Sequence, residues 1–170
     1  MFLDRLFKPR PAKLAAGELY AAAAMQARQP EFYTALRTPD TREGRFELYT
    51  LHVILLIERM KGQGEAAAET SQAVFDAYVR GLDDAFRELG VGDLSVAKKM
   101  KKLAEAFYGR LKAYQQVQAD PTELEALVGR TIPEADAAGL VAYLTAARDR
   151  LEGQPLDSLL AGAVTWPVPR

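Results

Sequence analysis

The pattern of residues 90–114 constrains the fold of this chain most. The stretch reads GVGDLSVAKKMKKLAEAFYGRLKAY, in which two glycines and two residues able to cap a helix, Asp93 and Ser95, precede a regular apolar series. Apolar side chains recur every three or four residues and so share one side of a helix. They are Val96, Met100, Leu103, Phe107, Leu111 and Tyr114. Because a long helix with such a stripe buries it against other elements, we predict a packed helical domain.

The opposite side of this helix is basic. Between residues 96 and 114 there are six cations and one anion, Glu105, a local charge of +5 in a chain of net charge −1. Two interpretations are open. The acidic side chains of residues 66–89 would neutralise this surface within the fold, or the surface would bind an acidic partner. Gly109 lies inside the helix, where glycine costs about 1 kcal/mol relative to alanine, and this predicts the close approach of another chain segment.

The rest of the chain also has helical signals and no convincing strand. Further helices are expected at 13–29, 31–36, 43–61 and 66–89, with a short one from Pro121 and a last turn at 156–160. Residues 131–134 (TIPE) form a capping-box pattern that predicts a helix to about Glu152. Residues 48–57 are almost entirely apolar but too few to cross a bilayer, so they predict a central core helix. The expected fold is all-α, a single-domain bundle of about six to seven helices.

The expected helix ranges also indicate the domain organisation. We expect a flexible or peripheral N-terminal segment at 1–12, a helical domain at 13–163 and an extended tail at 164–170, with Trp166 at the surface. The first ten residues place four apolar side chains beside three cations, a pattern that can rest on an anionic bilayer. No apolar run is long enough to span a membrane. We therefore expect a cytoplasmic protein, with peripheral contact at the cytoplasmic face of the inner membrane as an alternative.

The sequence offers little material for catalysis or for metal binding. Cysteine is absent, and His52 is the only histidine. His52 lies in the predicted core helix, which favours a hydrogen-bonded core histidine over a haem ligand or a base, so we expect no catalytic residue, metal or cofactor. A haem- or small-ligand-carrying bundle remains an alternative. The expected function is binding rather than enzymatic catalysis.

Contact with nucleic acids is only partly excluded. The order helix, glycine turn and basic helix resembles a helix–turn–helix, but the helix before the turn is too long and the net charge is −1, so we expect no DNA binding. The lysines could still bind RNA or a ribosome, because a local patch suffices to attract phosphates.

Several motifs identify a family. The segment FYTALRTPDTREGRF at 32–46, the triplet LHV at 51–53, the segment LGVGDLSV at 89–96, the lysines at 98–102 and FYGR at 107–110, followed by Ala113 and Tyr114, resemble the ubiquinol–cytochrome c chaperone family. The resemblance covers about residues 20–160. It implies a helical, non-enzymatic assembly factor of the cytochrome bc1 complex that binds newly made cytochrome b. Mitochondrial members act near the ribosomal exit with a small partner protein, and this short chain resembles a bacterial member.

The resemblance and the basic surface together suggest a contact surface that covers transmembrane or loop segments of the client. Two groups of candidate residues are predicted to contact partners. For Tyr114 the alternative to partner contact is a buried position in the core. For the second group the alternative is a hydrogen-bonded, capped loop. The groups are Lys98, Lys99, Lys101, Lys102, Tyr108, Arg110 and Tyr114 on the basic helix, and Asp40, Thr41 and Arg45 at a second edge.

Overall fold

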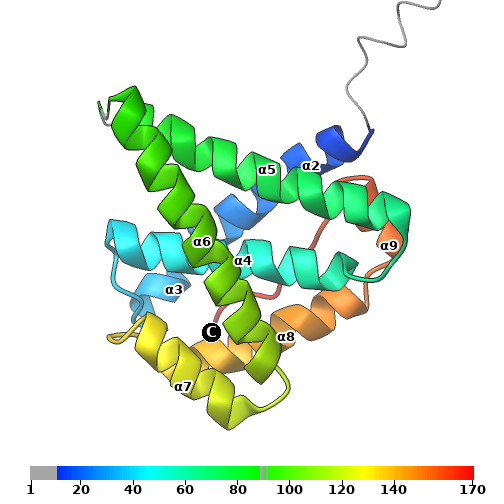
Figure 1. Ribbon diagram of the computed structural model, residues 1–170. Coiled ribbons are helices and arrows are strands. Elements are labelled where there is room, and N and C mark those ends of the chain that lie inside the picture. Colours follow the sequence, from blue (N-terminus) through cyan, green and yellow to red (C-terminus); the bar gives the residue numbers. More distant parts are fainter. Residues whose placement is uncertain (1–10, 89, 91) are drawn as a thin grey trace, which may run out of the picture.

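The described part of the protein is entirely helical. The computed structural model describes residues 11–88, 90 and 92–170, without the side chains of Asp93 and Leu94, and contains no strand in these ranges (Figure 1). The prediction of an all-α fold is confirmed. These ranges contain eight helices, six of them longer than six residues, which is roughly consistent with the expected six to seven; the two short ones are Glu31–Thr34 (α3) and Leu156–Leu160 (α9). The N-terminal segment proposed to meet a membrane lies outside the described residues.

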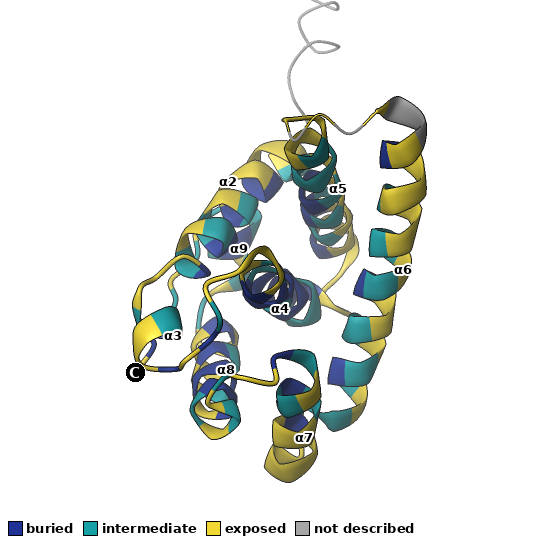
Figure 2. Cartoon of the chain, turned by 90° about the vertical axis from the view of Figure 1, so that its left-hand side faces the viewer, coloured by how far each residue is buried: buried dark blue, intermediate teal, exposed yellow. Residues whose placement is uncertain are grey.

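Helix α4 (Arg42–Met60) forms the centre of the fold, as its apolar sequence predicts. Figure 2 shows it end-on, surrounded by α2, α5, α6, α7 and α8. Val53, Ile54 and Leu56 are completely buried, and Leu48 and Leu55 nearly so. Burying each such side chain contributes roughly 1.5–3 kcal/mol, so this helix supplies much of the hydrophobic stabilisation.

Two long helices and one shorter helix pack around α4 on one side. Helices α2 (Pro11–Gln26) and α5 (Glu65–Glu88) lie against each other and against α4. Gly81 lies at their contact, where an added methyl group would meet the hydroxyl group of Tyr20. Helix α6 (Asp93–Val117) runs along the edge of the molecule and buries the apolar stripe that the sequence predicts, with Val96, Phe107 and Tyr114 almost inaccessible.

The C-terminal third closes the other side of α4. Helix α7 (Pro121–Thr131) begins at Asp120, whose side chain caps it, with proline in the first turn as predicted. Helix α8 (Ala137–Glu152) packs against α7 and α4. The capping box predicted at residues 131–134 is wrong, because the Thr131 hydroxyl donates to Leu127 O within α7 (2.8 Å) and Asp136 caps α8 through Gly139 N (3.0 Å). Asp136 also donates its backbone N–H to Leu36 O, which fixes the start of α8.

The C-terminal tail has no regular secondary structure, and Trp166 is partly buried against the core rather than fully exposed at the surface. Its ring meets the His52 ring edge-on at 5.0 Å between centroids, and its indole nitrogen is buried without a hydrogen-bond partner. Gln26 holds the tail by donating to Pro167 O (2.9 Å), and the Gln154 side chain accepts from Thr165 N (2.8 Å). Non-local packing therefore overrides the local tendency of a proline-rich end to stay exposed.

His52 occupies the core position that the sequence favours. Its side chain is completely buried, with Nδ1 2.7 Å from Leu48 O and Nε2 2.7 Å from the Tyr143 hydroxyl. A carbonyl can only accept, so Nδ1 carries the proton and Nε2 accepts from Tyr143. The Tyr143 oxygen accepts in turn from Gln26 Nε2 at 3.0 Å. Burial lowers the pKa of His52 to about 4, so the ring is neutral near pH 7.

Candidate functional site

An open groove lies where α4 ends, α5 begins and the middle of α6 passes. We call it the aromatic groove; its volume is about 310 Å³. Its walls are mainly apolar, with polar groups at the rim. The lining residues are Ile57, Met60, Lys61, Gly62, Ala68, Ser71, Gln72, Phe75, Phe107, Tyr108 and Leu111.

Three aromatic rings form the wall between α5 and α6. The ring of Phe75 lies 5.0 Å from that of Phe107 and 5.2 Å from that of Tyr108, measured between centroids. Phe107 is fully buried, whereas Tyr108 is 53% exposed. Tyr108 follows Phe107 directly, and one residue rotates a helix by about 100°, so the chain presents one ring to the core and the next to the groove and solvent. An exposed aromatic ring beside an apolar groove is typical of a binding surface.

The lysines of α6 are exposed, but none of them lines this groove. Lys98, Lys99, Lys101, Lys102 and Lys112 are all exposed, and none forms an ion pair with a described residue. The acidic side chains of α5 therefore do not neutralise them through direct pairs within the described ranges; Asp83 instead pairs with Arg87 of its own helix at 2.7 Å. Lys99 contacts α5 through its ammonium group, which lies 5.1 Å from the centre of the Phe86 ring.

Two predicted contact residues of α6 are used inside the protein. Tyr114 is 1% exposed and belongs to the core, so the prediction that it contacts a partner is wrong; the apolar stripe that it shares with Phe107 turns it inward. Arg110 forms a two-pronged ion pair with Glu47 of α4, with Nε 2.7 Å from Oε2. The side chain of Glu47 is only 11% exposed, so Arg110 neutralises a buried carboxylate and anchors α6 to α4.

The predicted close approach to Gly109 is also absent. A methyl group added there would meet nothing within 4 Å, and Gly109 is exposed. The close approaches occur at other glycines, including Gly44 and Gly81, where an added methyl group would meet Pro39 O and the Tyr20 hydroxyl respectively.

The second group of predicted residues lies at the opposite end of α4 from the groove. Thr41 caps α4 by accepting from Gly44 N at 3.1 Å, and Arg45 Nε lies 2.6 Å from Asp40 Oδ1. The hydrogen bond from Arg45 holds the pKa of Asp40 below its usual value. The 19 residues of α4 span about 27 Å, so the structure does not bring this capped loop together with the groove.

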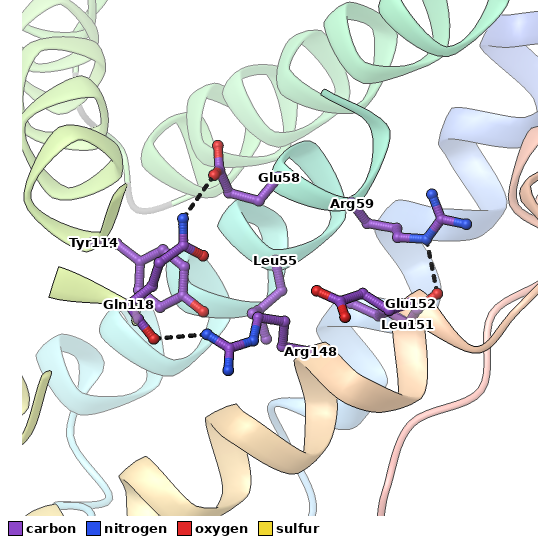
Figure 3. Close-up of a pocket in the computed structure, with 8 residues that line it drawn as sticks. All are labelled: Leu55, Glu58, Arg59, Tyr114, Gln118, Arg148, Leu151 and Glu152. Atoms are coloured by element: carbon purple, nitrogen blue, oxygen red, sulfur yellow. Dashed lines mark hydrogen bonds between the residues drawn. The ribbon is translucent and has the colours of Figure 1, made fainter. Parts of the chain in front are cut away.

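A second pocket, about 190 Å³ in volume, lies between α4, α6 and α8 (Figure 3). Its polar groups mostly satisfy one another. Gln118 donates to Glu58 (3.2 Å), Arg148 donates to Gln118 O (2.6 Å) and Arg59 donates to Leu151 O (2.8 Å). These contacts tie the C-terminal ends of α6 and α8 to their neighbours, where helix carbonyl groups run out of intrahelical donors; Leu151 O also accepts from Gln154 N at 3.2 Å. The pocket therefore serves chiefly as a junction of three helices.

The described residues give no support to a metal or haem site. No group of three or more His, Asp or Glu side chains is arranged to hold a metal ion within the ranges described, and the chain has no cysteine. Both ring nitrogens of His52 are occupied by hydrogen bonds in a closed core, so neither is available as a haem ligand. None of the helices described is apolar over a length sufficient to cross a bilayer.

Sequence reasoning singled out Tyr108 but missed the other walls of the groove. Phe75 is recognisable as part of the apolar stripe of α5, yet nothing in the sequence indicates that it lies at the open edge. Ile57, Met60 and Ala68 have ordinary helical core patterns. They meet only because the turn at 61–64 reverses the chain between α4 and α5, where Gly62 and Gly64 adopt positive φ angles of 72° and 99°.

Known proteins share this fold and parts of this sequence. A crystal structure of the Cbp3 homolog from Brucella abortus superposes with a TM-score of 0.86 and 35% identity, covering 99% of this chain and 97% of the other. A ubiquinol-cytochrome-c reductase complex assembly factor 1 from Xenopus laevis is 24% identical over 164 residues, 91% of this chain and 81% of that protein. The human factor of the same name is 25% identical, and the chain spans 54% of its length.

The match extends beyond single relatives. Residues 34–166 of the 170 fit the family described as ubiquinol-cytochrome C chaperone, a range that contains the capped loop, the core helix, the aromatic groove and the basic side of α6. With the conformation of the Brucella abortus protein reproduced over nearly the whole chain, these features show that the protein belongs to the ubiquinol–cytochrome c chaperone family.

Proposed function

We propose that this protein is an assembly chaperone for the ubiquinol–cytochrome c reductase (bc1) complex, and that it binds newly made cytochrome b until assembly proceeds. Membership of the chaperone family supports the general activity, and the relatives named as reductase assembly factors support the complex. The choice of cytochrome b follows from the family resemblance. The activity is binding without chemistry, since no bond in the client need be made or broken.

The observation that carries the proposal is the open aromatic groove, together with exposed α6 lysines that form no ion pair with a described residue. Inside the protein, apolar side chains are packed and charged ones are paired. On α6, in contrast, Tyr108 is half-exposed and the lysines have no described ion-pair partner. Such a combination suits a temporary complex, in which apolar contact gives affinity and charge gives orientation. We place the protein at the cytoplasmic face of the membrane that receives the client.

Photocrosslinking in living cells tests the client directly. A photoreactive phenylalanine analogue at Tyr108 is expected to capture cytochrome b, identified by mass spectrometry. The same analogue at Met25, an exposed apolar residue of α2 outside the groove, is the matched control and should capture much less. Equal capture from both positions would remove the groove from the site.

Deletion of the gene tests the function without reference to any site. The expected result is a lower content of b- and c1-type haem in membrane difference spectra, restored by the wild-type chain. A normal haem content would refute the assembly role.

The charge-reversed variant K98E/K101E/K102E should remain helical, because these side chains are exposed, yet lose cytochrome b in a pull-down.

Ribosome contact is a second candidate, and the exposed lysines favour it. Phosphate contacts are sequence-independent and weaken as salt rises, so a ribosome binder should co-sediment with ribosomes at low salt even when the client is not translated. Release by 200 mM salt together with loss in K98E/K101E/K102E would support this function. Co-sedimentation only during client translation would instead indicate contact through the client.

A small partner protein is proposed from the resemblance alone.

A further inference from the structure

We propose that the C-terminal tail, residues 163–170, is a displaceable strap, and that the surface under it binds an extended segment of a partner protein with one aromatic side chain. We call this surface the tail-docking surface; it consists of Gln26 of α2, His52 of α4 and Gln154, which follows α8. None of these three residues lines the aromatic groove. The identity of the partner, an unassembled client, rests on the proposed chaperone function.

Side-chain amides hold the tail by its backbone. Gln154 forms two hydrogen bonds with Thr165, accepting from its N–H at 2.8 Å and donating to its carbonyl group at 3.0 Å. Gln26 donates to Pro167 O at 2.9 Å. Among the described residues, no backbone-to-backbone hydrogen bond joins 164–170 to the rest of the chain. These contacts therefore address carbonyl and amide groups that every extended peptide carries, and they do not depend on the sequence of the tail.

One aromatic ring provides the side-chain anchor of the tail. Trp166 meets the His52 ring edge-on, with 5.0 Å between the centroids and 78° between the planes. The indole N–H of Trp166 is buried and has no hydrogen-bond partner in the described structure. Because an unpaired buried donor costs free energy, this contact weakens the attachment of the tail. A phenylalanine ring at the same place would not carry that cost.

The strap begins directly after a fixed turn. Gly162 adopts a positive φ of 87°, and an added methyl group there would crowd against α2. The N–H of Ala163 donates to Ser158 O in α9 at 2.8 Å. From this turn the tail, drawn in red, crosses behind α4 (Figure 1). Release of residues 164–170 breaks no backbone hydrogen bond of a described helix, so it requires only local opening.

The contacts of the tail indicate which occupant fits. Gln154 bonds both backbone groups of one residue and Gln26 bonds a carbonyl group two residues later, whereas a helix engages these groups within its own chain. A second copy of this chain offers the same tail, which would make the same contacts and lose translational freedom on association. An extended client segment with phenylalanine at the ring position makes these contacts and leaves no donor unpaired. We therefore assign the surface to such a segment.

Displacement of the tail is measured in the full wild-type chain. The probe is an unlabelled peptide with the sequence of residues 163–170 and the change W166F, so that Trp166 of the protein is the only tryptophan in the sample. The emission of Trp166 is expected to move to longer wavelength and to saturate, because water reaches the displaced ring. The same peptide with W166A lacks the ring and should need an about tenfold higher concentration, the factor that about 1.4 kcal/mol produces.

Two variants of the full chain separate the strap from the surface. W166A removes the ring of the tail, and Q154A removes the side chain that holds Thr165, so both loosen the tail. Only W166A keeps the tail-docking surface complete. It should bind the fluorescein-labelled W166F peptide about tenfold more tightly than the wild type, because the competing strap is weakened. Q154A should bind no more tightly than the wild type despite its loose tail.

The matched control is Q72A, which removes an exposed glutamine of α5 and should bind like the wild type. Circular dichroism shows whether each variant is folded. Amide hydrogen exchange of the wild type tests the strap even if W166A folds poorly. The Thr165 N–H should exchange through local opening, roughly tenfold or more faster than the N–H of Val53, a buried residue of α4. Equal opening free energies at the two amides would show that the tail leaves only on global unfolding, which overturns the inference.

The remaining outcomes separate this inference from its rivals. Unchanged Trp166 emission at saturating peptide, or equal action of the W166F and W166A peptides, overturns it. A wild-type dimer in sedimentation velocity that the peptide dissociates would assign the surface to a second copy and also overturns it. If no peptide binds while gene deletion still lowers the b- and c1-type haem content, the inference fails and the chaperone function stands. If the peptide displaces the strap but haem content is normal after deletion, the surface stands and the proposed function fails.

Discussion

Acidification should destabilise this protein through His52, the single histidine of the chain. In the folded state Nδ1 donates to Leu48 O, and Nε2 accepts from a Tyr143 hydroxyl whose oxygen already accepts from Gln26. A proton added at Nε2 would turn an acceptor into a donor. The Tyr143 hydroxyl proton would then lose its acceptor within a closed core, and the new charge would have no solvent.

The magnitude follows from the pKa. Burial lowers the pKa of His52 from 6.5 to about 4, whereas the unfolded chain titrates at the ordinary value. Between these pH values the unfolded state binds a proton that the folded state does not, so the free energy of unfolding falls as pH falls. The contribution is fully present above pH 6.5 and is lost by about pH 4. The shift is worth roughly 3 kcal/mol at about 1.4 kcal/mol per pKa unit, a large part of a typical stability of about 5–15 kcal/mol.

Urea unfolding between pH 7.5 and 4, followed by far-ultraviolet circular dichroism, measures this effect. Carboxylates also titrate in the lower part of this range, so the informative quantity is the difference between the wild type and H52Q. The wild type should be more stable near neutral pH, and the difference should shrink by roughly 3 kcal/mol as the pH approaches 4. The emission of Trp166, the only tryptophan, reports the same transition from beside the His52 ring.

A direct titration of His52 tests the same prediction even if H52Q folds poorly. The ring resonances of a lone histidine need no assignment by mutagenesis, and their chemical shifts give the pKa in the native protein. We expect the neutral Nδ1–H tautomer throughout the range in which the protein stays folded. A native pKa at or above 6.5, or a stability difference that does not vary with pH, would show that the core accommodates the charged ring.

Three further substitutions, at Gly109, Gly44 and Arg110, are expected to change the stability of the protein in different directions. G109A should raise the free energy of unfolding by about 0.5–1 kcal/mol, because the added methyl group meets nothing and alanine favours the helix; a loss would indicate a contact that forms in solution. G44A should lower the thermal midpoint by several degrees, because its methyl group would collide with Pro39 O, and G109A is its control. R110M should cost about 2 kcal/mol or more in urea unfolding by leaving Glu47 unpaired, and E47L in the same chain should recover most of the loss. If R110M alone is neutral, Glu47 must be hydrated in solution.

The sequence predicted most helices because helical signals are local. The spacing of Val96, Phe107 and Tyr114 already implies a buried stripe, and a proline after Asp120 already implies a helix start. The same locality explains the error at residues 131–134. Thr131 and Asp136 are both acceptable caps within their own segments, and the choice depended on a hydrogen bond from Asp136 to Leu36, which is distant in the sequence.

The site was predictable only in part. Lys98, Lys101 and Lys102 are recognisable as a basic cluster from their spacing alone, and the family motifs point to the same helix. The sequence could not show that Arg110 pairs with Glu47, 63 residues earlier, because like its lysine neighbours it is simply a cation on a polar side. It also could not show that Phe75 meets Tyr108.

What the sequence by itself determined is therefore the helical class, the central apolar helix, a hydrogen-bonded core histidine and the family, all of which depend on short-range pattern. Tertiary structure alone decided how the remaining groups are used: it paired Arg110 with Glu47, packed Trp166 against His52 and left Tyr108 at the mouth of a groove. The physical reason is that burial and charge pairing depend on contacts between segments far apart in the chain, and a local pattern carries no information about which segments will meet.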